Sequence, residues 1–144
     1  MCILAVDPGM VNIGVAMSDT TCTIANPLTT VKHSSRDGDA KKIALLAEEF
    51  MVERIIVGQS LDEDGQPTYE GRRSGRLAAA IRHIIQIPVQ LWDEHGSTQM
   101  AVNAQREMKV KRKQRRGHLD HLAAVVILQS YLDSMIDIHN ETSL

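Results

Sequence analysis

Four carboxylate side chains stand at positions where the sequence can bring them together for chemistry. Asp7 follows a run of apolar residues, Asp93 and Glu94 follow another, and Asp120 begins a third near the end of the chain. An ionised carboxylate is costly to bury unless it is paired or binds a metal ion. Carboxylate oxygens and water are the ligands that Mg²⁺ and Mn²⁺ prefer. Two such ions about 4 Å apart activate a water molecule and stabilise the leaving oxygen of a phosphodiester, so the pattern indicates a metal-dependent nuclease site.

Each of these acids also has a purely structural explanation. Asp7 precedes a Pro-Gly turn, where aspartate is common, and Asp120 stands where a carboxylate would favour the N-terminus of a helix. Asp120 lies one helical turn before Ala124, however, on the apolar stripe that must face the sheet. Side chains alternate along a strand, so the sequence leaves open whether Asp93 or Glu94 points inward.

The apolar periodicity predicts the elements that must position these acids. An unalternating apolar run that ends at a turn is typical of a strand buried on both faces, and spacings of three and four residues indicate helices. We expect Pro27 to make its strand an edge or bulged one, and Asp37 or Asp39 to cap the first helix. The predicted strands are 2–6, 13–17, 24–31, 54–58 and 89–92, and the predicted helices are 40–51, 73–86, 97–107 and 119–136.

This order of elements predicts an α/β fold. A hairpin meander followed by βα crossovers gives a mixed five-stranded sheet with helices on both faces. Sites in such sheets form where neighbouring strands end at the carboxyl edge, which places Asp7, the loop after Gly58 and the 93–94 pair at one rim. The polar loop from Gln59 is long enough to suggest a functional role.

Composition indicates one ordinary globular domain, spanning residues 1–144. The chain is 43% hydrophobic and 24% charged, with a net charge of −2, and no segment is long enough to span a membrane. Aromatic residues make up only 3% of the chain, which argues against binding nucleic acid by base stacking. The two cysteines, Cys2 and Cys22, lack the spacing of a metal site or a disulfide framework, so we expect a reducing, cytoplasmic location.

A concentrated basic segment lies just before Asp120. Such a run is usually a solvated charged loop, but beside an acidic site its cations would hold the phosphate backbone of a nucleic acid. His118 and His121 flank Asp120, but their spacing is a weak indication of a metal site. The basic side chains of the segment are Lys109, Lys111, Arg112, Lys113, Arg115 and Arg116.

Four stretches in this order resemble the YqgF family, also called RuvX. Its members are bacterial proteins of the ribonuclease H-like fold that are described as Holliday junction resolvases. The resemblance implies a nuclease dependent on Mg²⁺ or Mn²⁺, acting in 5′-end processing of pre-16S rRNA or, in the older assignment, on branched DNA. By position it implies that Asp7, Glu94 and Asp120 are the catalytic acids. The stretches are VDPGMVNIGVAMSD, RIIVGQSLDEDG, VQLWDEHGST and LDHLAAVVILQSYLD.

The chain departs from the family pattern near these acids. Val11 and Asn12 stand where the family usually has basic residues, and Ser60 replaces a proline that would stiffen its loop. His95 and Gly96 follow the Asp-Glu pair in place of Arg and Leu. The departures concern substrate grip and loop rigidity and leave the carboxylates unchanged.

Two other readings compete with the nuclease. Asp7, Gly9 and Gly14 resemble the phosphate-binding hairpin of actin-like ATPases and sugar kinases, which need two such domains where this chain has one. Alternatively, the basic segment would suffice for a nucleic-acid-binding or transcription-associated factor that does not cut. The sequence is compatible with a monomer or a homodimer, and a junction resolvase would require the dimer because it needs two active sites.

Overall fold

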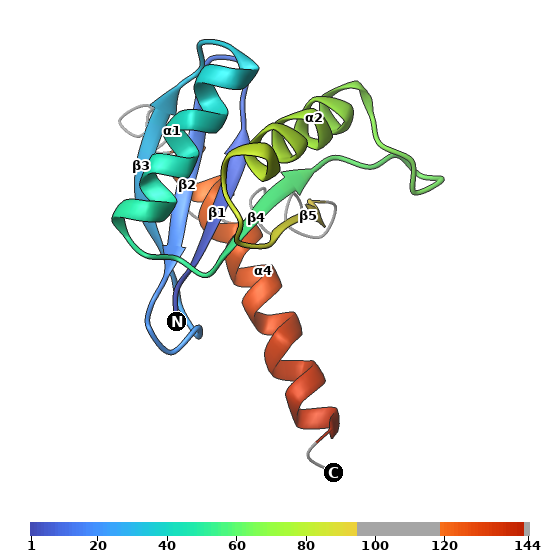
Figure 1. Ribbon diagram of the computed structural model, residues 1–144. Coiled ribbons are helices and arrows are strands. Elements are labelled where there is room, and N and C mark those ends of the chain that lie inside the picture. The colour runs from blue at the N-terminus through green and yellow to red at the C-terminus, as the bar shows by residue number, and fades with distance from the viewer. Residues whose placement is uncertain (95–118, 143–144) are drawn as a thin grey trace, which may run out of the picture.

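The computed structural model describes residues 1–94 and 119–142, with the side chains of the last helix described over 122–136. The described elements form a five-stranded sheet in the order β3-β2-β1-β4-β5 (Figure 1). β1 is the central strand, pairing antiparallel with β2 and parallel with β4. The strands are β1 (Ile3–Pro8), β2 (Asn12–Ser18), β3 (Ala25–Lys32), β4 (Arg54–Gln59) and β5 (Val89–Asp93), and the helices are α1 (Arg36–Glu49), α2 (Tyr69–Ile84) and α4 (Leu119–Thr142).

Helices cover both faces of this mixed sheet, which confirms the predicted architecture (Figure 1). Side chains alternate along each strand, so β1 sends Leu4 and Val6 to one core and Ile3 and Ala5 to the other. We call the first side the α1/α2 face and the second the α4 face, after the helices packed on them. The two cores therefore share the sheet, and any residue of β1 in register with Ala5 points toward α4.

The strands contribute leucine, isoleucine and valine to the α1/α2 face, whereas on the α4 face they contribute three alanines beside Ile3 and Ile56. α4 lies over Ala5 and Ala16, and its own Ala124 is fully buried there. Small residues let a helix backbone approach a sheet closely, so α4 packs tightly against β1 and β2. The side chains that α4 contributes to this core are Ala124, Ile127, Leu128, Tyr131 and Leu132.

The predicted strands and their directions are confirmed, with bounds that differ by a residue or two. β3 is an edge strand, and its register against β2 shifts where Pro27 lies, because proline cannot donate to the ladder. The predicted first-helix cap is wrong: α1 begins at Arg36, and the Ser35 hydroxyl accepts from the Gly38 amide at 3.0 Å. Asp39 instead bonds His33.

The second helix also begins earlier than predicted, at Tyr69 rather than Arg73. Thr68 caps α2, its side chain accepting from the Gly71 amide at 3.1 Å. The long polar loop is therefore confined to 60–68 and is ordered by Asp62, whose carboxylate accepts from the amides of Asp64 and Gln66. The predicted helix at 97–107 lies outside the described residues.

Two further observations concern the expected setting of the chain. Cys2 and Cys22 are both free thiols. No helix in the described part of the chain is long and apolar enough to cross a membrane.

A pair of glycines in α2 provides a test of the packing between that helix and β4. A Cβ at Gly71 would lie 2.1 Å from the Ser60 carbonyl oxygen, whereas a Cβ at Gly75 meets only the Gln59 amide nitrogen, at 3.8 Å. We expect Gly71→Ala to lower the free energy of unfolding by about 1–3 kcal/mol, because backbone must shift. Gly75→Ala, with space available, should raise it by about 0.5–1 kcal/mol through helix propensity. Urea denaturation measures both, and a Gly71→Ala protein as stable as the Gly75→Ala control would contradict this packing.

Candidate active site

Asp7 and Glu94 meet at the carboxyl edge of the sheet, on the α4 face. Asp7 lies two residues beyond Ala5, and Glu94 two residues beyond Trp92, so both follow residues that pack against α4. Their carboxyl groups are joined by a hydrogen bond, and both side chains are half-buried. Acids that are 87 positions apart in the sequence (94 minus 7) thus share one small site.

The position of Glu94 is set by β5 and by the helix beneath it. The Glu94 amide donates to the Gln59 carbonyl at 3.0 Å, which extends the pairing of β4 and β5 by one residue. Trp92 packs edge-on against Tyr131, with ring centroids 5.1 Å apart, and its indole N–H donates to the Ser130 hydroxyl at 3.3 Å. These contacts tie the end of β5 to α4 and hold the carboxylate over the α4 face.

Gly58 provides the space in which the Glu94 carboxyl group lies. A Cβ at Gly58 would stand 2.8 Å from Glu94 Oε1 and 2.6 Å from Ile127 Cδ1. Gly14, the cross-strand partner of Asp7, likewise carries no side chain. Glycines thus occupy two strand positions beside the acids, and the carboxyl groups lie in the space that side chains at these positions would fill.

The pKa of Glu94 is raised from 4.5 to about 7. Burial is the largest cause, followed by the negative charge of Asp7 and the hydrogen bond with it, and then by the charges of Glu70 and Asp93. A carboxyl group that keeps a proton near neutral pH relieves the repulsion between two adjacent acids. A cation bound between them would relieve it in the same way.

Glu70 is an acidic neighbour that the sequence analysis missed. It is exposed in the first turn of α2, and its charge acts on Glu94. The predicted start of α2 at Arg73 left Glu70 in a loop. The Thr-x-x-Gly cap at Thr68 was the signal that would have placed it at the helix end facing the strand termini.

The pair at 93–94 divides between the two sides of β5. Glu94 is turned toward Asp7, whereas Asp93 is exposed and precedes it on the alternating side. Asp93 affects Glu94 only through its charge, the smallest of the contributions to the raised pKa.

Asp120 lies in the first turn of α4, and its side chain lies outside the described residues. α4 crosses the sheet from the carboxyl edge, where Ile127 contacts Gly58, to the opposite edge, where the Gln129 side chain accepts from the Ala25 amide at 2.9 Å. The helix therefore starts on the same side as Asp7. The basic residues at 109–116, His95, Gly96 and His118 lie outside the described residues, as does the His121 side chain.

The carboxylate oxygens of the described site are suitable ligands for a hard divalent cation. Asp7 and Glu94 provide only carboxylate oxygens, the chemistry that Mg²⁺ and Mn²⁺ select over softer metals. Among the side chains that the structure describes, no three histidine, cysteine or acidic groups gather into a complete metal site. Asp7 and Glu94 would supply two ligands to such an ion, and water, substrate oxygens or a further acid would complete its coordination.

The raised pKa of Glu94 makes the metal-free fold less stable as pH increases. Below pH 4.5 the side chain is protonated in both states, but between 4.5 and about 7 the unfolded chain ionises first, so stability is lost through this window. Allowing for partial solvent exposure, we expect wild type to lose about 1–2 kcal/mol more than Glu94→Gln between pH 5 and pH 8. Urea titrations in chelator measure this difference. Asp133→Asn, which replaces an exposed acid of α4 that is not among the causes of the raised Glu94 pKa, serves as the control. Identical pH profiles for wild type and Glu94→Gln would contradict the arrangement.

Solved structures with the same fold include two that act on branched DNA. The chain is similar to RuvC of T. thermophilus in complex with a Holliday junction substrate, with a TM-score of 0.58 at 17% identity, covering 94% of this chain and 96% of that one. It is also similar to the Fowlpox virus resolvase in complex with Holliday junction DNA, with a TM-score of 0.59 at 14% identity over 94% and 99% of the two chains. At these identities the likeness establishes the ribonuclease H-like fold.

Sequence relatives and a family model extend the likeness beyond the fold. Proteins named "Putative pre-16S rRNA nuclease" are 40% identical in Thermoanaerobacter pseudethanolicus, over 93% of this chain and 97% of the relative, and 38% identical in Geobacillus kaustophilus, over 91% and 96%. The model of the RuvX family, described as Holliday junction resolvase, matches residues 1–134. Its match over nearly the whole chain, together with these relatives, shows that the protein belongs to the RuvX (YqgF) family of nucleases.

Proposed function

We propose that this protein hydrolyses phosphodiester bonds at the 5′ side of a 16S ribosomal RNA precursor, with Asp7, Glu94 and Asp120 as its catalytic carboxylates. The observation that carries the proposal is the hydrogen bond between the carboxyl groups of Asp7 and Glu94 at the carboxyl edge of the sheet. We assign Asp93 an electrostatic role rather than a metal contact, since its side chain is exposed.

Asp7, Glu94 and Asp120 would hold Mg²⁺ or Mn²⁺, and the chemistry that such an ion would supply is activation of the attacking water and stabilisation of the leaving oxygen. Asp7 provides a rigid ligand because β1 is paired on both sides and cannot shift without breaking two ladders. Glu94 would have to lose its proton for both carboxylates to hold a cation, because its raised pKa keeps it protonated up to about neutral pH. α4 covers one side of the pair and limits the access of bulk water, which strengthens electrostatic interactions in the site.

RNA is the first substrate to test, because relatives that bear the rRNA nuclease name are 34–40% identical and cover more than nine-tenths of this chain. The second candidate is branched DNA, which the description of the family model favours. The two differ in architecture, since a junction requires paired cuts and therefore two active sites acting together. A dimer in solution would support the second candidate.

Removing the charge of Asp7 or of Asp120 should abolish cleavage without unfolding the chain. We expect Asp7→Asn and Asp120→Asn to lower the cleavage rate at least about 100-fold, because each removes a charged oxygen ligand while preserving size. The measurement is cleavage of a labelled rRNA precursor and a four-way DNA junction side by side, with Mg²⁺, with Mn²⁺ and with chelator.

Asp133→Asn is the matched control, because Asp133 is an exposed acid of the same helix as Asp120 and accepts only from Gln129 among the described contacts. It should cleave at the wild-type rate. Cleavage by purified, folded Asp7→Asn protein at the wild-type rate would contradict the proposal.

Gly58→Ala tests whether the room at this strand position serves the site. The new methyl group would meet the ends of two flexible side chains, Glu94 and Ile127, rather than backbone, so the fold should lose only about 1 kcal/mol. Displacing the Glu94 carboxylate should lower the cleavage rate at least about ten-fold. Thermal melting and single-turnover cleavage separate the two effects. A variant whose activity falls no more than its stability explains would remove Gly58 from the mechanism.

A further inference from the structure

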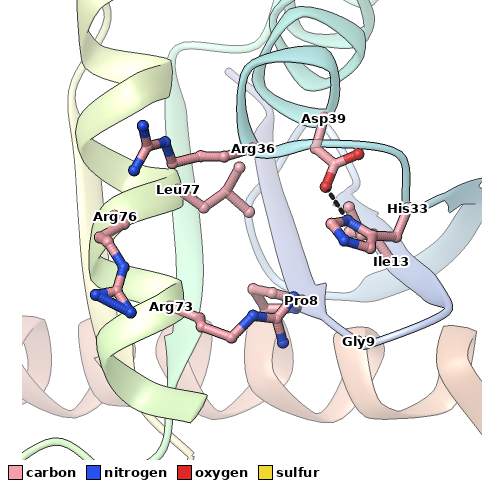
Figure 2. A pocket seen from close by; sticks show the side chains of 9 residues that line it. All are labelled: Pro8, Gly9, Ile13, His33, Arg36, Asp39, Arg73, Arg76 and Leu77. Carbon is pink, nitrogen blue, oxygen red and sulfur yellow. Dashed lines mark hydrogen bonds and ion pairs between the residues drawn. The ribbon is translucent and has the colours of Figure 1, made fainter. Parts of the chain in front are cut away.

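Two adjoining cavities lie between α1 and α2, on the face of the sheet opposite the carboxylates. The smaller, of about 180 Å³, runs beside the β1–β2 turn, and the larger, of about 490 Å³, continues between the helices. Arg36 of α1 and Arg76 of α2 line both, and we call the two adjoining cavities together the α1/α2 groove. Figure 2 shows the smaller cavity, with arginines from both helices at its walls.

The lining of this groove is strongly basic. Four permanent cations contribute to it, together with His33 and His83. This concentration is local, because the whole chain carries a net charge of −2. The four cations are Arg36, Lys41, Arg73 and Arg76.

The two acids in the lining do not neutralise these cations. Asp39 is already satisfied, since its carboxylate bonds His33 Nδ1 at 2.5 Å and accepts from the Ser34 amide at 2.9 Å. Asp37 lies 3.8 Å from Arg36 Nε, but both side chains are exposed, so solvent screens the pair. Among the described residues, no carboxylate forms an ion pair with Arg73 or Arg76.

The groove has the shape of a track for a chain of phosphates. Arg73, Arg76 and His83 share one stripe of α2, and the ten residue-to-residue steps from 73 to 83 span about 15 Å at 1.5 Å per residue. Ala79 and Ala80 lie between the basic side chains and keep the wall low. Successive phosphates of one duplex strand are about 3.4 Å apart along the axis, so a strand in this groove would present several of them. A single free phosphate would use only part of it.

The groove leads to the turn that carries Asp7. Pro8 and Gly9, directly after Asp7, form the end of the smaller cavity (Figure 2). Arg73 reaches across to this turn, its Nη1 lying 2.8 Å from Met10 Sδ. A nucleic acid strand bound in the groove would have to pass over the β1–β2 turn to reach the carboxylates on the other face.

We propose that the α1/α2 groove binds the sugar-phosphate backbone of the nucleic acid substrate beside the cut site, through Arg36, Arg73 and Arg76. The proposal rests on the proposed function for the identity of the substrate. It adds a second phosphate-binding surface to the one expected at 109–116, on described residues and on the opposite side of the sheet.

Binding of a labelled RNA precursor tests the groove separately from cleavage. The full chain carrying Asp7→Asn is titrated in chelator between about 50 and 200 mM KCl, with and without Arg36→Gln plus Arg76→Gln. We expect the groove pair to weaken binding about ten-fold and to reduce the slope of log K against log salt by about one to two, because two phosphate contacts are lost. Arg36→Lys plus Arg76→Lys keeps both charges and should retain most of the affinity and the slope.

The matched control is Lys42→Gln plus Arg72→Gln. It removes the same charge from exposed positions of the same two helices, outside the groove lining. Equal losses of affinity and slope in the groove and control pairs would overturn the proposal. So would a groove pair that abolishes binding of inorganic phosphate while leaving RNA affinity unchanged. Cleavage is not read in this assay, so absence of nuclease activity in the wild type would count against the proposed function and leave the groove result standing.

Discussion

The repulsion between two carboxyl groups is the constraint around which this structure is arranged. Asp7 and Glu94 lie within hydrogen-bonding reach on a half-buried face, where two ionised acids would repel strongly. The fold accommodates them by holding a proton on Glu94 up to about neutral pH. Adjacent carboxyl groups with a perturbed pKa are typical of functional sites, and a bound cation would relieve their repulsion as a proton does. The fold therefore keeps two acids adjacent at this edge of the sheet although their proximity costs stability.

The two faces of the sheet have different roles: the α1/α2 face makes the central strand rigid, and the α4 face contains the carboxyl groups. The α1/α2 face packs fully buried Leu4, Val6, Ile55 and Val57 beneath two helices, and this interlocking of large aliphatic side chains makes β1 rigid. The α4 face is built from smaller strand residues, with Gly58 at its end. The thin packing there brings α4 close to the strand ends and leaves room for carboxyl groups. The rigid central strand therefore holds Asp7 in a fixed position. Glycines at neighbouring strand positions leave the space that the carboxyl groups occupy.

Acidic and basic side chains are also concentrated on different faces of the sheet. The acids gather at the carboxyl edge on the α4 face, where Glu70 and Asp93 add to the negative field around Glu94. The arginines of the α1/α2 groove lie on the other face, joined to the acids only through the β1–β2 turn. Opposite charges so placed do not cancel each other. The basic side attracts a polyanion, and the acidic side needs cations before a phosphate can approach it.

The sequence alone determined the sheet, its strand directions and the edge at which the acids lie. Short unalternating apolar runs such as Leu4–Val6 have few alternatives to buried strands, and the order of strands and helices then limits the topology to a mixed sheet with β1 at its centre. It also indicated Asp7 as a candidate site residue, because further acids, at 93–94 and 120, were expected at the same edge, although the Pro-Gly turn after Asp7 gave it a structural explanation as well. Helix starts were less accurate, since the caps at Ser35 and Thr68 compete locally with several other polar residues.

Only the tertiary structure decided that Glu94 is the partner of Asp7, and only it revealed the roles of Gly58 and of the α1/α2 groove. Whether Asp93 or Glu94 faces inward depends on the register of β5 against β4. Because side chains alternate along a strand, a register shift of one residue would turn the other acid inward. The role of Gly58 could not be read from its strand, because its neighbours Glu94 and Ile127 come from segments far along the chain. The α1/α2 groove was likewise hidden, since Arg36 and Arg76 become neighbours only when two helices pack side by side on one face of the sheet.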